Sequence, residues 1–204
     1  IGSGFPVSAY LGLQALLVAL CLGPILGVIA SLNQNKWPDY LSMVVAILGI
    51  SVPSFVLGTV LIQFVAAKSG GIFPVSGWKS VRYTILPTIA LAMSPLAFTA
   101  RLMRSSMLEV LNQDYIKTAK SKGLAGGTVI VRHAIRNAIL PIISVLGTIT
   151  TNLVVGSFVV EKIFAIPGLG MYFVSSITSR DYPIIMGTTV FYAMVLIIML
   201  LLVD

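Results

Sequence analysis

Residues 112–141 read NQDYIKTAKSKGLAGGTVIVRHAIRNAILP and are polar, whereas nearly all of the remaining chain is apolar enough to lie in lipid. The stretch holds five of the 13 Lys and Arg residues and the one histidine of the chain. A glycine cluster at 123–127 divides it into two pieces. A polar helix–break–helix between long apolar runs predicts a docking element held at a membrane surface. Its basic side chains are Lys117, Lys120, Lys122, Arg132, His133 and Arg136.

The second piece, residues 128–140, has the period of an amphipathic helix, in which successive residues advance by about 100°. Thr128 is the predicted N-cap, because its hydroxyl can accept a hydrogen bond from a free N–H of the first turn. One arc of the helix is polar and contains Arg132, His133, Arg136 and Asn137. The apolar arc contains Ile130, Val131, Ala134, Ile135, Ala138 and Ile139.

The first piece, residues 108–122, has the same period and predicts one continuous helix. Gly123 follows a last turn that carries lysines, and is expected to end the helix with a left-handed or otherwise restricted backbone. The predicted apolar face contains Leu108, Leu111, Tyr115 and Ala119. The polar face contains Glu109, Gln113, Lys117 and Lys120.

Composition identifies the bilayer as the solvent of this chain. Of its 204 residues 57% are hydrophobic, and its mean hydropathy is +1.03. Only 9% are charged, whereas soluble domains carry about 25%. The net charge of +7 is typical of basic residues at the ends of membrane spans. No basic–aromatic face or known reader module indicates nucleic-acid binding. Cys21 lies within an apolar run and is expected to be a buried packing residue.

Five runs lack Asp, Glu, Lys and Arg, and each predicts a membrane-spanning helix of about 20 residues. The run 83–100 is short and needs its flanks, and Pro53 is expected to kink or end the span that contains it. The uncharged stretch 163–179 is interrupted by PGLG at 167–170, so we expect a turn and a short helix near the outer surface, not a span. The five runs are 1–35, 40–67, 83–100, 137–160 and 182–203.

Loop charge predicts the orientation of these spans. Loops 36–39 and 101–136 share one side and carry eight Lys and Arg residues, whereas loops 68–82 and 161–181 share the other and carry five. Because basic residues are enriched on the cytoplasmic side, the first set is expected to face the cytoplasm. Lys120 and His133 would then be cytoplasmic, and Lys79 and Arg180 would lie outside.

Blocks of residues along the whole chain resemble the membrane-spanning permeases of ABC importers. The blocks are FPVSAYLG at 5–12, SVPSF at 51–55, DYIKTAKSKGL at 114–124, VRHAIRNAILP at 131–141, VVEKIFAIPGLG at 159–170 and RDYP at 180–183. Their wording is similar to the oligopeptide/dipeptide/nickel subfamily, and within it to oligopeptide permease subunits of the B type. Residues 112–141 resemble the cytoplasmic EAA loop of these permeases, although only Ala119 and Gly123 match its general pattern well.

The resemblance implies an all-α polytopic membrane protein with the type I importer permease fold, in which residues 1–204 are a single domain. About five spans lie in this chain and six are expected in the full protein, whose N-terminus we expect to precede Ile1. The resemblance also implies a bacterial or archaeal cytoplasmic membrane, a second homologous permease, two cytosolic ABC ATPase subunits and an extracytoplasmic solute-binding protein. No cofactor is expected in this chain, because ATP and magnesium would bind to the ATPase subunits.

Two groups of site residues follow from the same resemblance. The loop at 112–141 is expected to couple the chain to an ATPase, and the loop at 161–183 to form an extracytoplasmic gate or to contact the binding protein. The coupling residues are Asp114, Lys117, Ala119, Lys120, Gly123, Leu124, Arg132, His133 and Arg136. The outer residues are Glu161, Pro167, Gly168, Gly170, Arg180 and Asp181.

The residues themselves indicate no enzyme or metal site. One histidine and one cysteine, far apart in the chain, form neither a metal cluster nor a nucleophile pair. Residues 71–80 lack the spacing of a phosphate-binding loop. The spans have uncharged cores, which argues against a proton-driven carrier. An ATP-driven importer subunit for peptides or related solutes is therefore the leading hypothesis, and a non-transporting scaffold that docks a cytosolic partner is the alternative. The solute, whether oligopeptide, dipeptide, nickel or glutathione, is left open.

Overall fold

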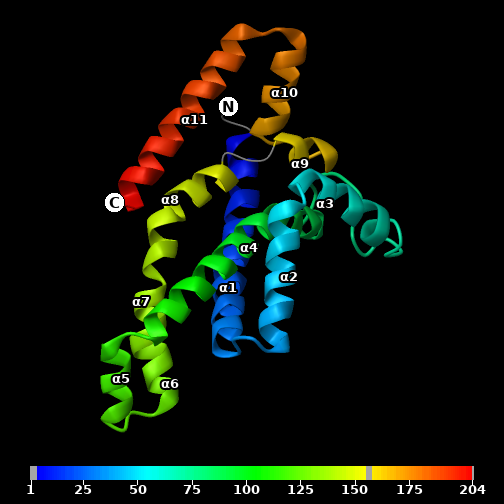
Figure 1. The fold of residues 1–204 in the computed structure, drawn as a ribbon. Coiled ribbons are helices and arrows are strands. Elements are labelled where there is room, and N and C mark those ends of the chain that lie inside the picture. The colour runs from blue at the N-terminus through cyan, green and yellow to red at the C-terminus, as the bar shows by residue number, and fades with distance from the viewer. Residues whose placement is uncertain (1–3, 155–157, 204) are drawn as a thin grey trace.

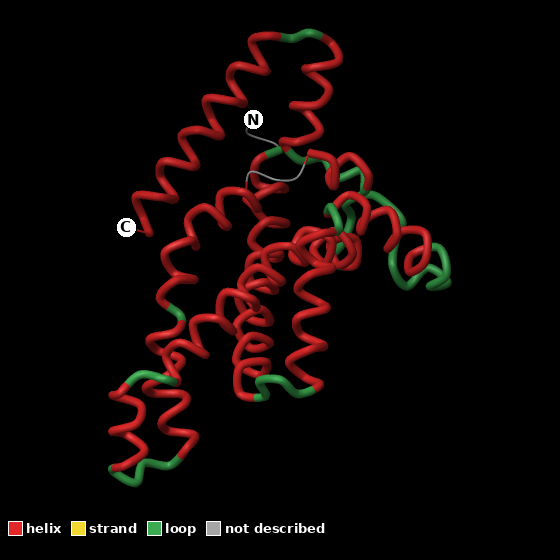
Figure 2. The backbone as a smooth tube through the Cα atoms, viewed as in Figure 1, coloured by secondary structure: helices red, strands yellow, loops and turns green. Residues whose placement is uncertain are grey.

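The structure, a computed structural model, describes residues 4–154 and 158–203, and every regular element within those ranges is a helix (Figures 1 and 2). Four stretches are long and apolar enough to cross a membrane. They are α1 (Phe5–Leu32), α4 (Arg82–Leu111), the stretch Leu140–Ile163 formed by α8 (Leu140–Val154) and α9 (Phe158–Ile163), and α11 (Tyr182–Val203). Four of the five predicted spans are thereby confirmed, although residues 155–157 of the run 137–160 lie outside the described part.

The predicted span at 40–67 is interrupted at Pro53, as expected. It is divided into α2 (Trp37–Ser51) and α3 (Ser54–Leu61), which continues as a π-helical segment η1 (Ile62–Ala66). The two halves are bent by 103°. Val52 is extended, with ψ 116°, because the ring of Pro53 disfavours helical geometry at the residue before it. The described chain therefore has four candidate spans, or five if this bent pair is one span.

Close helix contacts hold α1 against α4. A Cβ atom added to Gly27 would lie 2.5 Å from the carbonyl oxygen of Ala100 and 2.6 Å from Cβ of Met103, so no side chain fits there. Across the same contact, Thr99 Oγ1 donates to the carbonyl of Ala19 at 3.3 Å. The small-residue spacing at Gly23 and Gly27 therefore lets the two helices approach closely. Cys21, in contrast, is exposed on α1, so its predicted burial is wrong.

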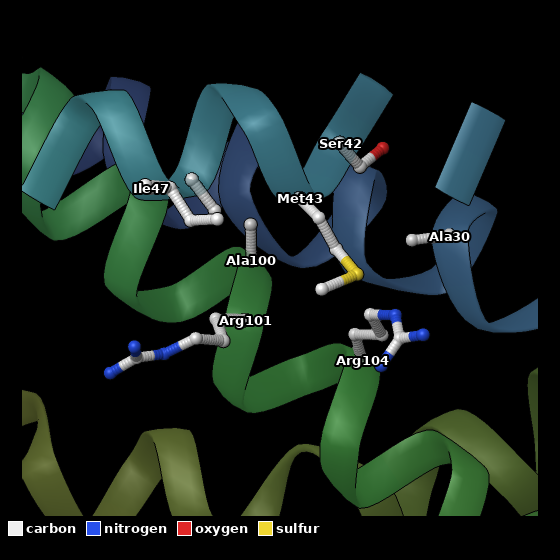
Figure 3. A pocket seen from close by; sticks show the side chains of 8 residues that line it. Ala30, Ser42, Met43, Ile47, Ala100, Arg101 and Arg104 are labelled. Atoms are coloured by element: carbon white, nitrogen blue, oxygen red, sulfur yellow. The ribbon is translucent and has the colours of Figure 1, made fainter. Parts of the chain in front are cut away.

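An ion pair fixes the start of α2 to α4. The guanidinium of Arg104 donates from Nη2 to Oδ2 of Asp39 at 2.7 Å and from Nε to Oδ1, and Asp39 is 1% exposed. The backbone N–H of Asn35 donates to Asp39 Oδ2 at 3.0 Å. Next to this pair, α1, α2 and α4 enclose a small cavity of about 60 Å³, where Met43 and Arg104 extend toward each other (Figure 3).

As predicted, residues 163–179 contain a turn and are not one continuous helix. α9 ends at Ile163, the chain turns, and α10 (Leu169–Ser179) follows. Arg180, with φ 58°, ends α10 in a left-handed conformation before α11 begins. The turn between α1 and α2 lies toward one end of the molecule and α9–α10 lie toward the other (Figure 1).

Candidate functional site

A helical hairpin projects from the end of the molecule opposite α10 (Figures 1 and 2). Its first arm is α5 (Asp114–Ser121). Its second arm is one nearly continuous helical path made of α6 (Gly126–Thr128), the π-helical segment η2 (Val129–Ile135) and α7 (Arg136–Ala138), and it leads into α8. The hairpin therefore stands directly between two candidate spans, α4 and α8, and contains all nine predicted coupling residues.

The predicted helix over 108–122 is wrong in its continuity. α4 ends at Leu111, and the side-chain amide of Asn112 donates to the carbonyl of Leu108 at 2.8 Å. Gln113 is extended, and α5 starts at Asp114, whose carboxylate suits the first turn of a helix. Because the chain turns here, the two parts do not share one helical phase. Tyr115 is consequently exposed, and Ile116 takes the buried place.

The two arms of the hairpin pack on an apolar core that continues into α4. Ile116 and Ala119 from the first arm meet Val129 and Ala134 from the second, and all four are buried. The same cluster includes Ala138, Ile142 and the α4 residues Met103 and Met107. Ala119 is 5% exposed, so its small side chain serves packing inside this chain and offers little surface to a partner.

The second arm begins before the predicted cap. Its N-cap is Ala125, and Thr128 lies inside the helix with φ −65° and ψ −41°. The π-helical hydrogen bonding of η2 changes the rotation from one residue to the next about the helix axis. Faces that are assigned at the 100° per residue of an α-helix are therefore displaced along this segment. Val131 is therefore exposed where burial was predicted, whereas Val129 is buried.

Gly123 ends α5 with the predicted left-handed backbone, at φ +78°. Its N–H donates to the carbonyl of Lys120 at 3.0 Å, and that of Leu124 reaches the carbonyl of Ala119 at 3.4 Å. This is the hydrogen-bond pattern of a Schellman motif, which favours glycine. A Cβ at Gly123 would meet no atom within 4 Å, so the backbone angle, and no contact within the chain, requires glycine here.

The surface of the hairpin is basic. Lys117, Lys120, Lys122, Arg132 and Arg136 are exposed, and His133 is half-buried. Lys117 Nζ lies 2.9 Å from Oδ1 of Asp114, but both side chains are largely in solvent, and such a pair contributes little to stability. The arrangement offers a partner a cationic surface with an exposed leucine, Leu124, at its tip.

Glu161 lies at the far end of the molecule and is fully buried. Ser8 Oγ of α1 donates to Oε1 of Glu161 at 2.7 Å, and the N–H of Gly170 donates to Oε2 at 2.7 Å. Ser8 Oγ also accepts from the N–H of Leu169 at 2.9 Å. The carboxylate thus joins α1, α9 and the start of α10, and its burial leaves it no exposed surface for a soluble partner.

Of the other predicted outer residues, Pro167 and Gly168 lie at this joint, whereas Arg180 and Asp181 follow the opposite end of α10. Gly168 lies against Glu161 and Ser8 so closely that a Cβ would collide with both, and Pro167 precedes it in the turn. Arg180 is exposed, and Asp181 accepts at Oδ1 from the N–H of Ile184 at 3.3 Å at the start of α11.

The loop at 68–82 reaches the same end of the molecule. The N–H of Gly77 donates to the carbonyl of Phe164 at 2.8 Å, and the rings of Tyr10 and Trp78 meet edge to face at 5.9 Å. The two loops predicted to share the outer side are therefore in contact. Ser8 is the member of this region that sequence reasoning missed, since no local pattern marks a serine near the start of a long apolar helix. No group of three or more potential metal ligands occurs among the described residues.

Comparison with known proteins gives similar sequences among transport permeases. The chain is 58% identical to the dipeptide transport system permease protein DppB of Bacillus subtilis over 98% of this chain and 65% of that protein. It is 40% identical to the oligopeptide transport system permease protein OppB of Haemophilus influenzae over 100% of this chain and 67% of that protein. It is 38% identical to the glutathione transport system permease protein GsiC of Escherichia coli over 100% of this chain and 66% of that protein. The chain thus spans about two thirds of the length of these relatives.

A solved structure has the same fold. The crystal structure of an amino acid ABC transporter with histidines superposes with a TM-score of 0.74, covering 98% of this chain and 89% of that one at 17% identity. Its helices and those described here follow the same course, which confirms the predicted all-α permease fold. Residues 23–204 match the model of the binding-protein-dependent transport system inner membrane component, and this chain belongs to that family.

Proposed function

We propose that the chain is the membrane-spanning permease subunit of an ATP-binding-cassette importer that moves short peptides across the cytoplasmic membrane. The observation that carries the proposal is the packed basic hairpin between two candidate spans, in a chain 58% identical to a dipeptide permease. The similar OppB and GsiC proteins are named for oligopeptide and glutathione transport, and glutathione is itself a small peptide. Short peptides are therefore the favoured solutes.

The hairpin is the proposed coupling element. Two cytosolic ATPase subunits would bind and hydrolyse ATP with magnesium, and one of them would receive the basic surface of α5 and η2. Because Ile116 and Val129 share one core with Met103 and Met107 of α4, a displacement of the hairpin is passed to the spans through packed side chains. A second homologous permease would complete the membrane part of the complex.

The opposite end of the molecule is proposed to face outward. There the buried Glu161 joint fixes α9 and α10 to α1, while Arg180 lies at the exposed turn before α11. An extracytoplasmic solute-binding protein would contact the exposed part, and the joint would transmit that contact to α1. Glu161 is accordingly proposed as a gate residue and Arg180 as a contact residue.

Reconstitution tests the proposal. The full-length chain is placed in proteoliposomes with its second permease, ATPases and binding protein, and ATP-dependent uptake of labelled dialanine and trialanine is measured. Uptake that needs all four kinds of subunit is the expected result. A stable complex that binds the ATPases but accumulates no peptide would contradict the proposal and favour a docking scaffold.

A further inference from the structure

A recess of about 410 Å³ lies between the end of α2, α4 and α8. Its wall is mostly apolar and includes Ile50, Phe98 and Ile149, but three polar side chains interrupt it. These are Ser94 on α4 and, four residues apart on one side of α8, Thr148 and Asn152. A mostly apolar wall with a few polar groups, at a volume of a few hundred Å³, is typical of a small-molecule site.

The three polar side chains have no hydrogen-bond partner within the part of the chain that the structure describes, and all three are exposed. Two other hydroxyls on α8 have partners within the helix. Ser144 donates to the carbonyl of Pro141 and Thr151 to that of Gly147, at 2.8 and 2.9 Å. Thr148 and Asn152, in contrast, are unpaired among the described residues and line the recess.

Contact with the hydrocarbon of the bilayer would be unfavourable for this surface. An amide such as that of Asn152 offers two donors and an acceptor, and leaving them unpaired in lipid is costly. Polar side chains within spans generally face the interior of the assembly or a water-filled cavity. The recess is accordingly expected to meet water or a polar ligand in the assembled complex.

On the basis of the proposed function, we propose that this recess is part of the solute pathway and that Thr148 and Asn152 hydrogen-bond the main-chain amides of the passing peptide. The side chain of Asn152 carries the same C=O and N–H groups as a peptide unit, so it can pair with a peptide backbone as donor and acceptor at once. The apolar remainder of the wall accepts side chains of many shapes without a specific polar partner. Recognition of the backbone alone would let one pathway carry peptides of different sequence.

Accessibility to a water-soluble reagent tests the pathway. In a Cys21→Ser background of the full-length chain, Thr148→Cys and Asn152→Cys are assembled with the other subunits in proteoliposomes and treated with a charged methanethiosulfonate. Both are expected to react, and dialanine with binding protein and ATP should slow the reaction at least threefold. The matched control is Ile143→Cys, since Ile143 is 46% exposed on the same helix but lies on the face opposite to Asn152. It should react slowly, with no effect of peptide.

Uptake by polar-to-apolar variants is the second measurement. Asn152→Ala and Thr148→Val should each lower dialanine uptake about tenfold at unchanged permease content, whereas Ile143→Ala should not. No reaction at positions 148 and 152 would place this face against the second permease and overturn the inference, as would wild-type uptake in both polar variants. A wild-type complex without peptide uptake is a separate outcome, which would refute the proposed function and this inference with it.

Discussion

Ser8 Oγ donates a 2.7 Å hydrogen bond to Oε1 of Glu161, across a separation of 153 residues in the chain. The bond ties the first turns of α1 to α9, and the second carboxylate oxygen ties α9 to α10 through the N–H of Gly170. All of these groups are buried, so water cannot replace a lost partner. This joint is a buried polar link among the three helices at the proposed outer end.

Removal of the Glu161 carboxylate should destabilise the permease. Glu161→Ala leaves Ser8 and the N–H of Gly170 without acceptors, and each buried unpaired group costs about 1–3 kcal/mol. We expect a lower midpoint of thermal unfolding in detergent, and Glu161→Gln should recover part of the loss because it keeps one acceptor oxygen. Glu109→Ala is the control, since Glu109 is exposed on α4. Equal midpoints for Glu161→Ala and the control would show that the joint is unimportant for stability.

The Arg104–Asp39 pair makes a second prediction. Asp39 is 1% exposed, so Arg104→Met would leave a buried carboxylate without its cation, which costs about 3 kcal/mol or more. The variant should expose α2 to protease and lower the yield of folded permease. Arg104→Lys should be intermediate, because an ammonium cannot form the same two parallel bonds.

The control for this prediction is Arg101→Met, one turn earlier on α4. Arg101 is exposed and also borders the small cavity, so its substitution changes the same surface without removing the partner of Asp39. Protease resistance of Arg104→Met equal to that of Arg101→Met would mean that the pair does not hold α2 in place.

Orientation in the membrane is a third prediction. Lys120 and His133 lie on the hairpin, and Lys79 and Arg180 lie near the opposite end, so the two pairs should react from opposite sides. Single cysteines at these four positions, in a Cys21→Ser background, are labelled in intact cells with an impermeant maleimide. Positions 79 and 180 should react, and positions 120 and 133 should react only after the cells are opened. The reverse pattern would invert the proposed topology.

The sequence could predict the features that depend on local properties. The length of an apolar run is local, and it placed α1, α4, α8–α9 and α11 correctly. The left-handed angle of Gly123 is also local, because a glycine after a helix end favours it. PGLG at 167–170 likewise predicted the turn before α10.

Features that depend on distant contacts or on a changed helical period could not be predicted in the same way. The partner of Glu161 lies in α1, and no pattern near Ser8 identifies it. α3 packs against α4 and α9, and such tertiary contacts have no local signal, so the sequence indicated a break at Pro53 but not the 103° bend. In the hairpin, the π-helical segment moved Val129 into the core and Val131 out of it, because a phase read at 100° per residue assumes an unbroken α-helix.

Gly123 provides the sharpest test of the proposed coupling. An alanine at φ +78° is strained by about 1 kcal/mol or more, so Gly123→Ala should shift the tip of the hairpin without touching the spans. Gly123→Trp adds bulk at the same place. Both variants should insert at wild-type levels, and peptide-stimulated ATP hydrolysis and uptake by the assembled complex should fall several-fold, more for tryptophan than for alanine.

Two further variants separate the backbone angle from the mere loss of a glycine. A Cβ atom at Gly126 would also meet no other atom within 4 Å, but φ of Gly126 is not in the left-handed region. Gly126→Ala should therefore keep normal coupling. Gly123→Asn should retain more activity than Gly123→Ala, because asparagine adopts the left-handed region more readily. If Gly123→Trp hydrolyses ATP and transports peptide as the wild type does, per molecule of permease in the membrane, the hairpin tip does not couple the two.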